Sequence, residues 1–520
     1  MGVRLLVRFG VFQWRLLASR AIIAVLAVGW LVLLGLGAAW DHDFLATAPL
    51  LLTFLAVGAF AGVWGGPDEQ ALRTWLAGSA VSARAALLAS VVGRAVPLIL
   101  AVVVQAVVIA AVRAQGAGVS VGELAAGGGA VLVQTAGMCT VLSLFLPGAF
   151  NAVAFLIVAA SAFQGLSAFL AGADGLTKVA LSIMNPLLWS VPQRTAQSVW
   201  GPLLTGLVLV ALAVLAAPAR AVLRTASLPG AVLAVESAAN SFRRFLRRRQ
   251  RVLRGVGFTV PRGRIVGLLG RNGAGKTTTL RAILGELALD EGGVTWQHGC
   301  RAAARFLPET DPLAAGLRPR HYLPLVATGA ESERVHRLAE LLHVGECLGA
   351  RAGALSFGQR RRAALLVTVA APAPVYLLDE PATGIDPLEL EAMKGLLRQL
   401  RGEGAAVILS THLLREFEDV IDEVVLLDGG RVIAAGPVAE LEARLAAVAL
   451  DRNAELPGLL PEGSVVSGAR IIVAEGQRAA LVAALTEAGV AFQEVPPTLH
   501  DVFSWTVQST AVRVEEGSRA

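Results

Sequence analysis

Cysteine and lysine are both scarce in this 520-residue chain. The three cysteines are odd in number and scattered, which excludes a disulfide framework, and none has the spacing of metal ligands. We expect them to be reduced packing residues in a cytosolic or membrane setting. Lysine occurs only at positions 178, 276 and 394, so a motif that requires lysine rarely arises by chance.

Charge is scarce as well. Charged residues make up 16% of the chain, hydrophobic residues 55%, and the mean hydropathy is +0.64, which is too apolar for a soluble enzyme. Residues 1–220 hold few acidic groups and several long apolar runs, whereas the remainder has normal charge density. The length gives room for about three domains. We therefore expect part of the chain to sit in lipid.

Six apolar segments have the length of a membrane-spanning helix. They lie near residues 21–40, 44–64, 95–112, 126–146, 149–171 and 201–219. With the N-terminus inside, about nine basic residues fall on the cytoplasmic side and about three outside. An even number of spans also returns the chain to the cytoplasm. The sequence thus predicts a six-span α-helical bundle, residues 1–225, as a multi-pass domain of the cell membrane.

Three features of this half allow two interpretations each. Residues 1–20 lack a signal cleavage site and form either an amphipathic interfacial helix or an ordinary charged flank. The inner connection 65–93 either presses on the cytoplasmic domain or is a solvated loop. The mid-span glutamines Gln105, Gln134 and Gln164 either line a polar path or hydrogen-bond neighbouring helices.

The boundary to a second domain lies at Leu228-Pro229-Gly230, which breaks the apolar pattern. From there to about residue 440, strand-like runs alternate with helical ones, which predicts a parallel sheet with helices on both faces. We place this α/β domain at residues 226–440. Its densely basic stretch 242–254 contacts anionic headgroups or nucleotide phosphate, or it is a solvated hairpin face.

A phosphate-binding loop is the most specific pattern in this domain. Residues 270–278, GRNGAGKTT, fit G-x-x-x-x-G-K-[ST] between a buried strand at 265–269 and a helix at 279–284. Glycines let backbone N–H groups approach a nucleotide phosphate, and the helix N-terminus adds partial positive charge. A Gly-rich turn without ligand is the alternative. The predicted ATP-binding residues of this loop are Gly270, Asn272, Gly273, Gly275, Lys276, Thr277 and Thr278, with Thr277 also binding Mg²⁺.

Acidic and histidine side chains follow two other predicted strands. The apolar run 375–378 ends in Asp379 and Glu380, at the edge where parallel sheets keep their ligands. We expect Asp379 to hold Mg²⁺ and Glu380 to polarise the attacking water, the alternative being an ordinary strand end. The run 405–409 is soon followed by His412, which either contacts the γ-phosphate or is a surface histidine.

Together these motifs resemble the nucleotide-binding domain of an ATP-binding cassette (ABC) transporter. Residues 355–359, LSFGQ, resemble the family's signature motif and lie about 23 residues before Asp379. Residues 384–387, GIDP, resemble its D-loop. The resemblance implies that two cassettes stack head to tail, so that Ser356 and Gly358 of one subunit close over ATP held by the other. Nucleotide contacts are expected for Ser356, Gly358, Gln359 and Asp386.

The sequence departs from the family pattern at two positions. Phe357 stands where the signature usually has glycine, which leaves Ser356 and Gly358 to bind nucleotide. Glu309 stands where the family generally has glutamine, and it either takes over the contact with metal and membrane domain or is an unrelated strand-end residue. The aromatic that stacks on adenine is assigned to Phe242, with Phe245 or a packing role as alternatives.

Residues 441–520 form an appended region in which 497–503 resemble the end of cassette proteins that serve type-two ABC exporters. The resemblance implies an ATP-hydrolysing transporter half that works as an exporter. The lack of charged residues in the middle of the predicted spans favours a hydrophobic or amphipathic substrate, such as a lipid, peptide or natural product. We expect a homodimer, and a heterodimer with a second half-transporter is the alternative. The rival function is an ATP-driven membrane switch that acts on a partner protein without moving cargo. No nucleic-acid partner is expected.

Overall fold

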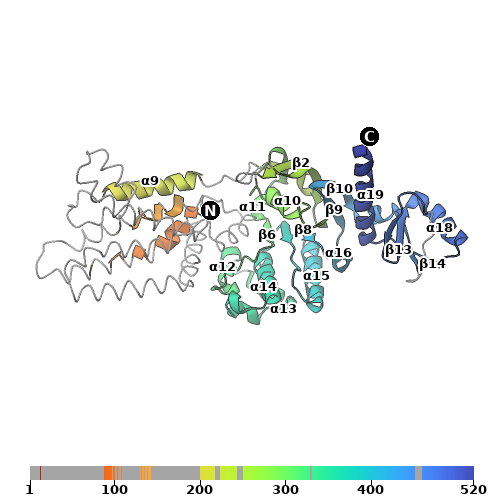
Figure 1. Cartoon of the computed structure of the whole chain (residues 1–520). Coiled ribbons are helices and arrows are strands. Elements are labelled where there is room, and N and C mark those ends of the chain that lie inside the picture. The colour runs from red at the N-terminus through yellow and green to blue at the C-terminus, as the bar shows by residue number, and fades with distance from the viewer. Residues whose placement is uncertain are drawn as a thin grey trace, which may run out of the picture.

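A computed structural model of the chain describes most of its second half and parts of its first half. The described residues are 12, 87, 88, 90–95, 98, 99, 102, 103, 107, 129, 132, 133, 135–137, 139–141, 200–216, 223–242, 250–287, 289–327, 331–450 and 460–519. Figure 1 shows a layered α/β unit in the middle and a smaller unit, drawn in dark blue, toward the C-terminus.

A six-stranded sheet forms the centre of the α/β unit, in the order β10-β9-β4-β8-β7-β6. Each pair of adjacent strands in this sheet is parallel, except the pair of β9 and β10, which is antiparallel. Strands β4, β7 and β8 are buried throughout because helices cover both faces, as predicted. The strands are β4 (Ile265–Gly270), β6 (Arg305–Leu307), β7 (Val375–Asp379), β8 (Ala406–Thr411), β9 (Glu423–Asp428) and β10 (Arg431–Pro437).

Helices pack on this sheet around two apolar cores, one on each face. The longer helices are α10 (Lys276–Ile283), α13 (Ser332–Leu341), α14 (Phe357–Val369) and α15 (Pro387–Gly402). Short helical turns are α11 (Cys300–Ala303), Pro319–His321, α12 (Leu323–Val326), Glu346–Gly349, Ala352–Ala354 and α16 (Leu414–Phe417). The cysteines at 139, 300 and 347 are buried and are not disulfide-bonded, in line with the expected packing role.

A second sheet, three of whose strands come before β4 in the chain, corrects the expected strand–helix alternation. Its order is β1-β5-β2-β3, and β2 runs antiparallel to both β3 and β5. A parallel connection needs a dozen or more residues, and only residues 243–249 separate β2 from β3, so the chain turns back as a hairpin. The strands are β1 (Arg224–Ala226), β2 (Ala231–Phe242), β3 (Gln250–Pro261) and β5 (Glu291–Gln297).

The C-terminal unit has its own antiparallel sheet, in the order β12-β13-β11-β14, with helix α18 over a small apolar core. Its elements are β11 (Leu445–Leu450), β12 (Val465–Ser467), β13 (Arg470–Ala474), the turn Glu475–Gln477, α18 (Arg478–Glu487), β14 (Phe492–Val495) and α19 (Leu499–Arg519). Helix α17 (Val438–Glu442) connects the two units. The predicted domain limits at 225/226 and 440/441 fall inside β1 and α17 and stay predictions.

Helix α19 begins at a buried ionic junction with the rest of the chain. The Asp501 carboxylate is fully buried, accepts hydrogen bonds from the Thr498 backbone N–H at 2.9 Å and hydroxyl at 3.0 Å, and pairs with Arg470 at 2.6 Å. The next backbone N–H, that of Leu499, donates to Glu418 at 2.7 Å. The segment 497–503, singled out in the sequence, therefore fastens α19 to both β13 and the residue after α16.

Removing the buried carboxylate should destabilise the protein measurably. Asp501→Ala leaves Arg470 without its ion-pair partner and removes the carboxylate that accepts from the Thr498 N–H at the start of α19, so we expect a loss of about 3 kcal/mol in the free energy of unfolding. The matched control is Asp419→Ala, because Asp419 is 47% exposed and pairs with Lys394 at 3.2 Å on the surface. Its cost should be about 0–1 kcal/mol. Equal costs in urea unfolding would contradict the junction's role.

The first half of the chain is described only in part. Helix α9 (Trp200–Ala216) overlaps the predicted span 201–219, and described positions within 95–112 and 126–146 are helical. Among the described residues, no helix combines the length and the apolar character needed to cross a membrane. The predicted spans 21–40, 44–64 and 149–171, and the glutamines at 105, 134 and 164, lie outside the described residues.

Candidate nucleotide-binding site

The phosphate loop connects β4 to α10 as predicted. Gly273 and Gly275 have φ values of 82° and 107°, in the left-handed region that favours glycine. A side chain at Gly270 would lie 2.4 Å from the Leu427 carbonyl oxygen of β9, so the loop also needs glycine for close packing. Helix α10 begins at Lys276, three residues earlier than expected, with Gly275 at its N-cap. Its free N–H groups are thus available to an anion.

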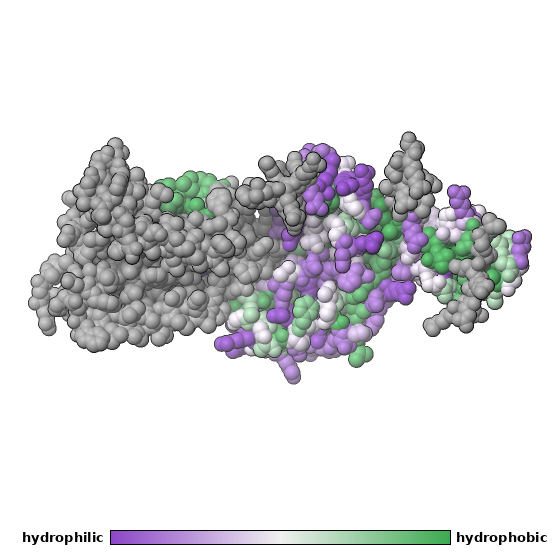
Figure 2. All heavy atoms as spheres, viewed as in Figure 1, coloured by the Kyte–Doolittle hydropathy of each residue, from purple (hydrophilic) through white to green (hydrophobic). Residues whose placement is uncertain are grey.

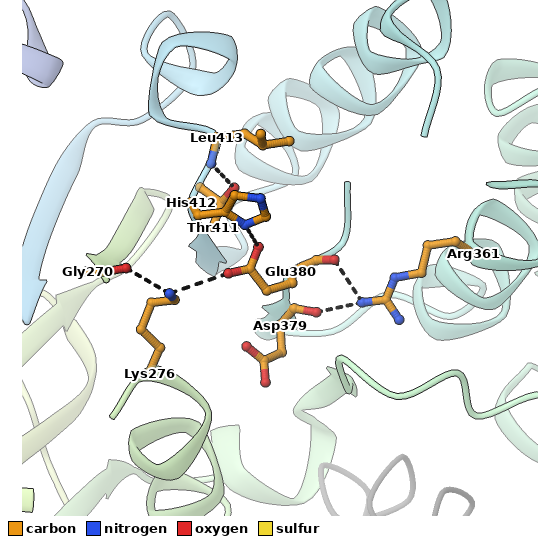
Figure 3. Close-up of polar contacts among 8 residues, drawn as sticks. All are labelled: Gly270, Lys276, Arg361, Asp379, Glu380, Thr411, His412 and Leu413. Atoms are coloured by element: carbon orange, nitrogen blue, oxygen red, sulfur yellow. Dashed lines mark hydrogen bonds and ion pairs between the residues drawn. The ribbon is translucent and has the colours of Figure 1, made fainter. Parts of the chain in front are cut away.

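Three predicted site residues meet at the carboxyl ends of β4, β7 and β8. Figure 3 shows Lys276, Glu380 and His412 pointing toward one another from three separate segments. The Lys276 ammonium donates to the Gly270 carbonyl at 2.8 Å and lies 3.5 Å from Glu380 Oε1. His412 Nδ1 is 2.7 Å from Glu380 Oε2. A buried carboxylate is therefore held between a cation and an imidazole whose side chain is 52% exposed.

Glu380 has an unusual backbone conformation. Its φ of 48° lies in the left-handed region, which costs a non-glycine residue about 1–2 kcal/mol. Its N–H donates to the Ser410 carbonyl at 2.9 Å, which joins the end of β7 to β8. Strained residues that the surrounding structure holds in place gather at functional sites, so the conformation supports a site at Glu380.

Asp379 offers a carboxylate with unused acceptors. The side chain is fully buried, and within the described chain neither oxygen has a hydrogen-bond partner of normal geometry. Burial raises the pKa of Asp379, while the nearby Thr277 and Ser410 hydroxyls lower it and Glu309 and Glu380 raise it. Orphaned carboxylate oxygens beside a threonine hydroxyl are the oxygen ligands that Mg²⁺ prefers.

The fit to Mg²⁺ rests on these carboxylate and hydroxyl oxygens alone. In the described ranges, His, Cys, Asp and Glu side chains do not form a group of three or more that could hold a metal ion. Glu309 lies after β6, is exposed, and is close enough to influence the Asp379 pKa. Its predicted role toward metal is compatible with this position and stays a prediction.

The signature segment lies at the start of α14. The Ser356 hydroxyl accepts from the Gln359 N–H at 3.2 Å, and the Gln359 side chain accepts from the Ser356 N–H at 3.0 Å, forming a capping box. Ser356 and Gln359 are exposed, and in the described part of the chain their side chains bond to each other's backbone rather than to the phosphate loop. These side chains therefore face outward from the site of their own chain.

Phe357 and the D-loop pack against each other. Gly384 has a φ of 71°, and a side chain there would lie 2.3 Å from the Phe357 ring, so the departure from glycine at 357 is accommodated by glycine at 384. Asp386 caps α15 by accepting from the Leu388 N–H at 2.9 Å. Phe242 ends β2, but its side chain and all of Phe245 lie outside the described residues, so the adenine contact stays a prediction.

Sequence reasoning missed Arg361, which approaches Glu380 from the side opposite to Lys276 in Figure 3. Its guanidinium donates to four backbone carbonyls, those of Pro308, Glu309, Asp379 and Glu380. Burial lowers its pKa to about 10. Three consecutive arginines follow the signature, and nothing in the sequence distinguishes the one that turns inward.

Comparison with known proteins identifies the second half of the chain. The family model described as ABC transporter matches residues 253–383. An ABC-type transporter ATP-binding protein, EcsA of Bacillus subtilis (strain 168), is 32% identical over 207 residues, which are 37% of this chain and 84% of that protein. The Escherichia coli (strain K12) lipopolysaccharide export system ATP-binding protein LptB is 31% identical over 212 residues, covering 37% and 87% of the two chains.

Two further matches cover different shares of the matched proteins. The Nod factor export ATP-binding protein I of Ralstonia nicotianae is 34% identical over 206 residues, and the chain spans 64% of that relative's length. A solved ATP-binding subunit of an ABC transporter is 29% identical, with a TM-score of 0.37, covering 41% of this chain and 92% of that one. These matches, like the others, cover less than half of the chain.

Proposed function

We propose, from the premise that this chain belongs to the ABC transporter family, that it is one half of an ATP-driven exporter with a membrane domain fused to its cassette. The observation that carries the proposal is the cluster of Lys276, Glu380 and His412 beside the phosphate loop. The cassette's ATP binding follows from the family. The fusion, export direction and substrate are proposed.

The residues of the cluster divide the hydrolysis reaction among them. When ATP enters, Lys276 leaves Glu380 Oε1 and the Gly270 carbonyl and donates to the outer phosphates. The phosphates together carry more negative charge than either of these two groups. Glu380 then accepts a proton from water as the water oxygen bonds to the γ-phosphorus and the bond to ADP breaks. His412 holds Glu380 Oε2 in place. Mg²⁺ bound by Thr277 and Asp379 would neutralise phosphate charge.

A dimer of cassettes supplies the remaining contacts to ATP. Ser356 and Gln359 face away from their own phosphate loop, so a second cassette is needed to bring a signature onto the nucleotide. A C2 interface places the same patch on both subunits and therefore yields two equivalent sites. The phosphate loop, Asp379, Glu380, Ser356 and Gly358 are all present in this one chain, which favours a homodimer over a heterodimer.

Exposed apolar side chains support a membrane setting for the first half. Helix α9 carries five large apolar residues that are each more than half exposed, and Figure 2 shows this helix as a green patch. Helical positions between 88 and 107 also carry exposed apolar side chains, at intervals of four or seven residues: Leu88, Val92, Ile99, Val103 and Val107. Contiguous apolar surface of this kind mostly marks a protein or lipid contact. Lipid is the proposed contact because hydropathy predicts spans at both places.

One contact connects the N-terminal segment to the cassette. The Phe12 ring is buried and packs edge-on against Tyr322, with ring centroids 4.7 Å apart. Tyr322 is itself buried in the larger apolar core and accepts a hydrogen bond from the Ala314 N–H at 2.7 Å. Movement of the cassette can therefore reach residue 12 directly, as well as through the inner connection 65–93 proposed from the sequence.

Phe12→Ala should uncouple the two halves more than it impairs hydrolysis. Loss of the ring removes the packing on Tyr322 but touches no residue of the nucleotide cluster. We expect basal ATP turnover to stay within about threefold, and transport in vesicles to fall about tenfold or more, since truncating a buried phenylalanine costs about 3–5 kcal/mol of packing. Phe12→Leu, which keeps apolar volume, is the control. Transport unchanged in Phe12→Ala would refute this contact as a transmission route.

The rival function is a membrane switch that acts on a partner protein without cargo. The two functions differ in what stimulates hydrolysis. An exporter in vesicles responds to its cargo alone and accumulates it, because the coupling between ATP and cargo lies within the dimer. A switch responds to the partner protein and accumulates nothing. The deciding experiment measures ATP turnover and uptake in inverted vesicles with a panel of amphipathic compounds, with and without membrane extract.

A further inference from the structure

We infer that Arg361 is a positioning residue for ATP hydrolysis, because it fixes the backbone from which the catalytic glutamate projects. The inference rests on the proposed hydrolysis at Glu380. Arg361 comes from α14, five residues after the signature serine, and its side chain is 2% exposed. Its guanidinium binds the main-chain carbonyls of Asp379 and Glu380 and not the Glu380 carboxylate.

The guanidinium holds the ends of two neighbouring strands. One terminal nitrogen, Nη2, donates to the Asp379 carbonyl at 2.5 Å and to the Glu380 carbonyl at 3.1 Å, at the end of β7. The other, Nη1, donates to the Pro308 carbonyl at 2.6 Å and to the Glu309 carbonyl at 3.3 Å, just after β6. A planar guanidinium can reach both pairs at once, whereas an ammonium is a single point donor.

These bonds act where the chain is strained. Glu380 is left-handed, and the two carbonyls that Arg361 binds, those of Asp379 and Glu380, flank its φ and ψ angles. Without the guanidinium both would be buried acceptors with fewer partners, and the strained turn would lose its support. A small rotation of this turn moves the Glu380 carboxylate away from Lys276 and His412. Catalysis is sensitive to such displacements, at about 10²-fold for 1 Å.

The position of Arg361 also ties two sites together. Ser356 is the N-cap of helix α14, and the proposed dimer places it on the partner's nucleotide. Arg361, in the second turn of the same helix, binds the end of the active-site strand of its own chain. A helix transmits such a movement as a rigid element. When Ser356 closes on one nucleotide, the movement of α14 therefore shifts the backbone of Glu380 at the other nucleotide.

Arg362 provides a matched control within the same helix. It too is buried and donates to main-chain carbonyls, those of Leu342 at 2.7 Å and His343 at 3.4 Å, and it pairs with Glu389 at 2.9 Å. None of these groups belongs to the nucleotide cluster. Replacing either arginine by lysine removes the same planar fork, so a general loss of stability should affect both variants alike.

The test compares wild type, Arg361→Lys and Arg362→Lys in ATP turnover, ATP and ADP affinity, and thermal unfolding. We expect Arg361→Lys to lower kcat about 10- to 100-fold while KM and ADP affinity change less than about threefold. Arg362→Lys should keep kcat within about threefold at a comparable melting temperature. Equal kcat values in the two variants, or a loss in Arg361→Lys confined to KM, would overturn the inference.

Two outcomes separate this inference from the proposed function. Absence of ATP turnover in wild type would contradict the proposed ATP-driven function itself. Normal wild-type turnover together with normal turnover in Arg361→Lys would contradict only the positioning role of Arg361. If Arg361→Lys does not fold, Arg361→Gln, which keeps amide donors, replaces it. Failure of both to fold beside a folded Arg362→Lys would assign Arg361 to the fold instead and overturn the inference.

Discussion

Glu380→Gln is expected to bind ATP normally and to lose most of its turnover. The amide keeps the shape of the side chain, but it cannot accept the proton of the attacking water, and loss of a general base costs about 10²–10⁴-fold in rate. Turnover is measured as phosphate release, and ATP affinity by calorimetry on the same preparation. The largest effect should lie in kcat, with KM nearly unchanged.

The chain offers a matched control for this variant. Glu389 lies 2.8 Å from His343 Nδ1, which reproduces the pairing of Glu380 with His412 at a distance from the phosphate loop. Glu389→Gln should therefore leave kcat within about twofold, since no reacting atom is near it. Wild-type turnover in Glu380→Gln would refute the assignment of the base.

Lys276→Ala is expected to weaken nucleotide binding itself. The ammonium is the positive charge that lies next to the loop carbonyl of Gly270, and hydrogen bonds from charged donors contribute about 1.5–3 kcal/mol. We expect ATP affinity to fall about 10- to 100-fold, with ADP affected less because it lacks the γ-phosphate. The measurement is calorimetric titration of both nucleotides.

Lys394→Ala is the control for the loss of a lysine. Lys394 belongs to α15 and pairs with Asp419 at 3.2 Å and Glu391 at 2.5 Å, so its removal should leave nucleotide affinity unchanged. If Lys276→Ala bound ATP as tightly as this control, the loop would not be the phosphate site.

The sequence predicted the central sheet well because its strands are buried on both faces. Runs such as 375–378 and 405–409 contain almost no polar residues, and the polar groups that follow them mark strand ends. The boundaries differed by one to three residues: β8 continues through Thr411 because it pairs with β4 up to Leu269. The second sheet was not predicted, although the hairpin interpretation of the basic stretch 242–254 agrees with the antiparallel pairing of β2 with β3.

The residues of the candidate site that belong to sequence motifs could be predicted. Lys276, Glu380 and His412 are separated by more than 100 residues in sequence at their extremes, yet parallel strands bring them to one edge. Contacts through the main chain could not be predicted: Arg361 binds four carbonyls, and any donor of that length satisfies the same sequence pattern. The left-handed conformation of Glu380 likewise leaves no trace in residue type.

The most direct test of the central claim, that two cassettes share each nucleotide, is a mixed dimer of Lys276→Ala with Ser356→Asp. Aspartate still caps α14 but repels phosphate, so each variant alone has two inactive sites. Pairing them leaves one site with both Lys276 and Ser356 intact in every mixed dimer, and random pairing should restore about a quarter of wild-type turnover. Recovery at that level is the predicted result. Turnover that stays at the level of the separate variants, in a preparation shown to contain mixed dimers, would contradict the account.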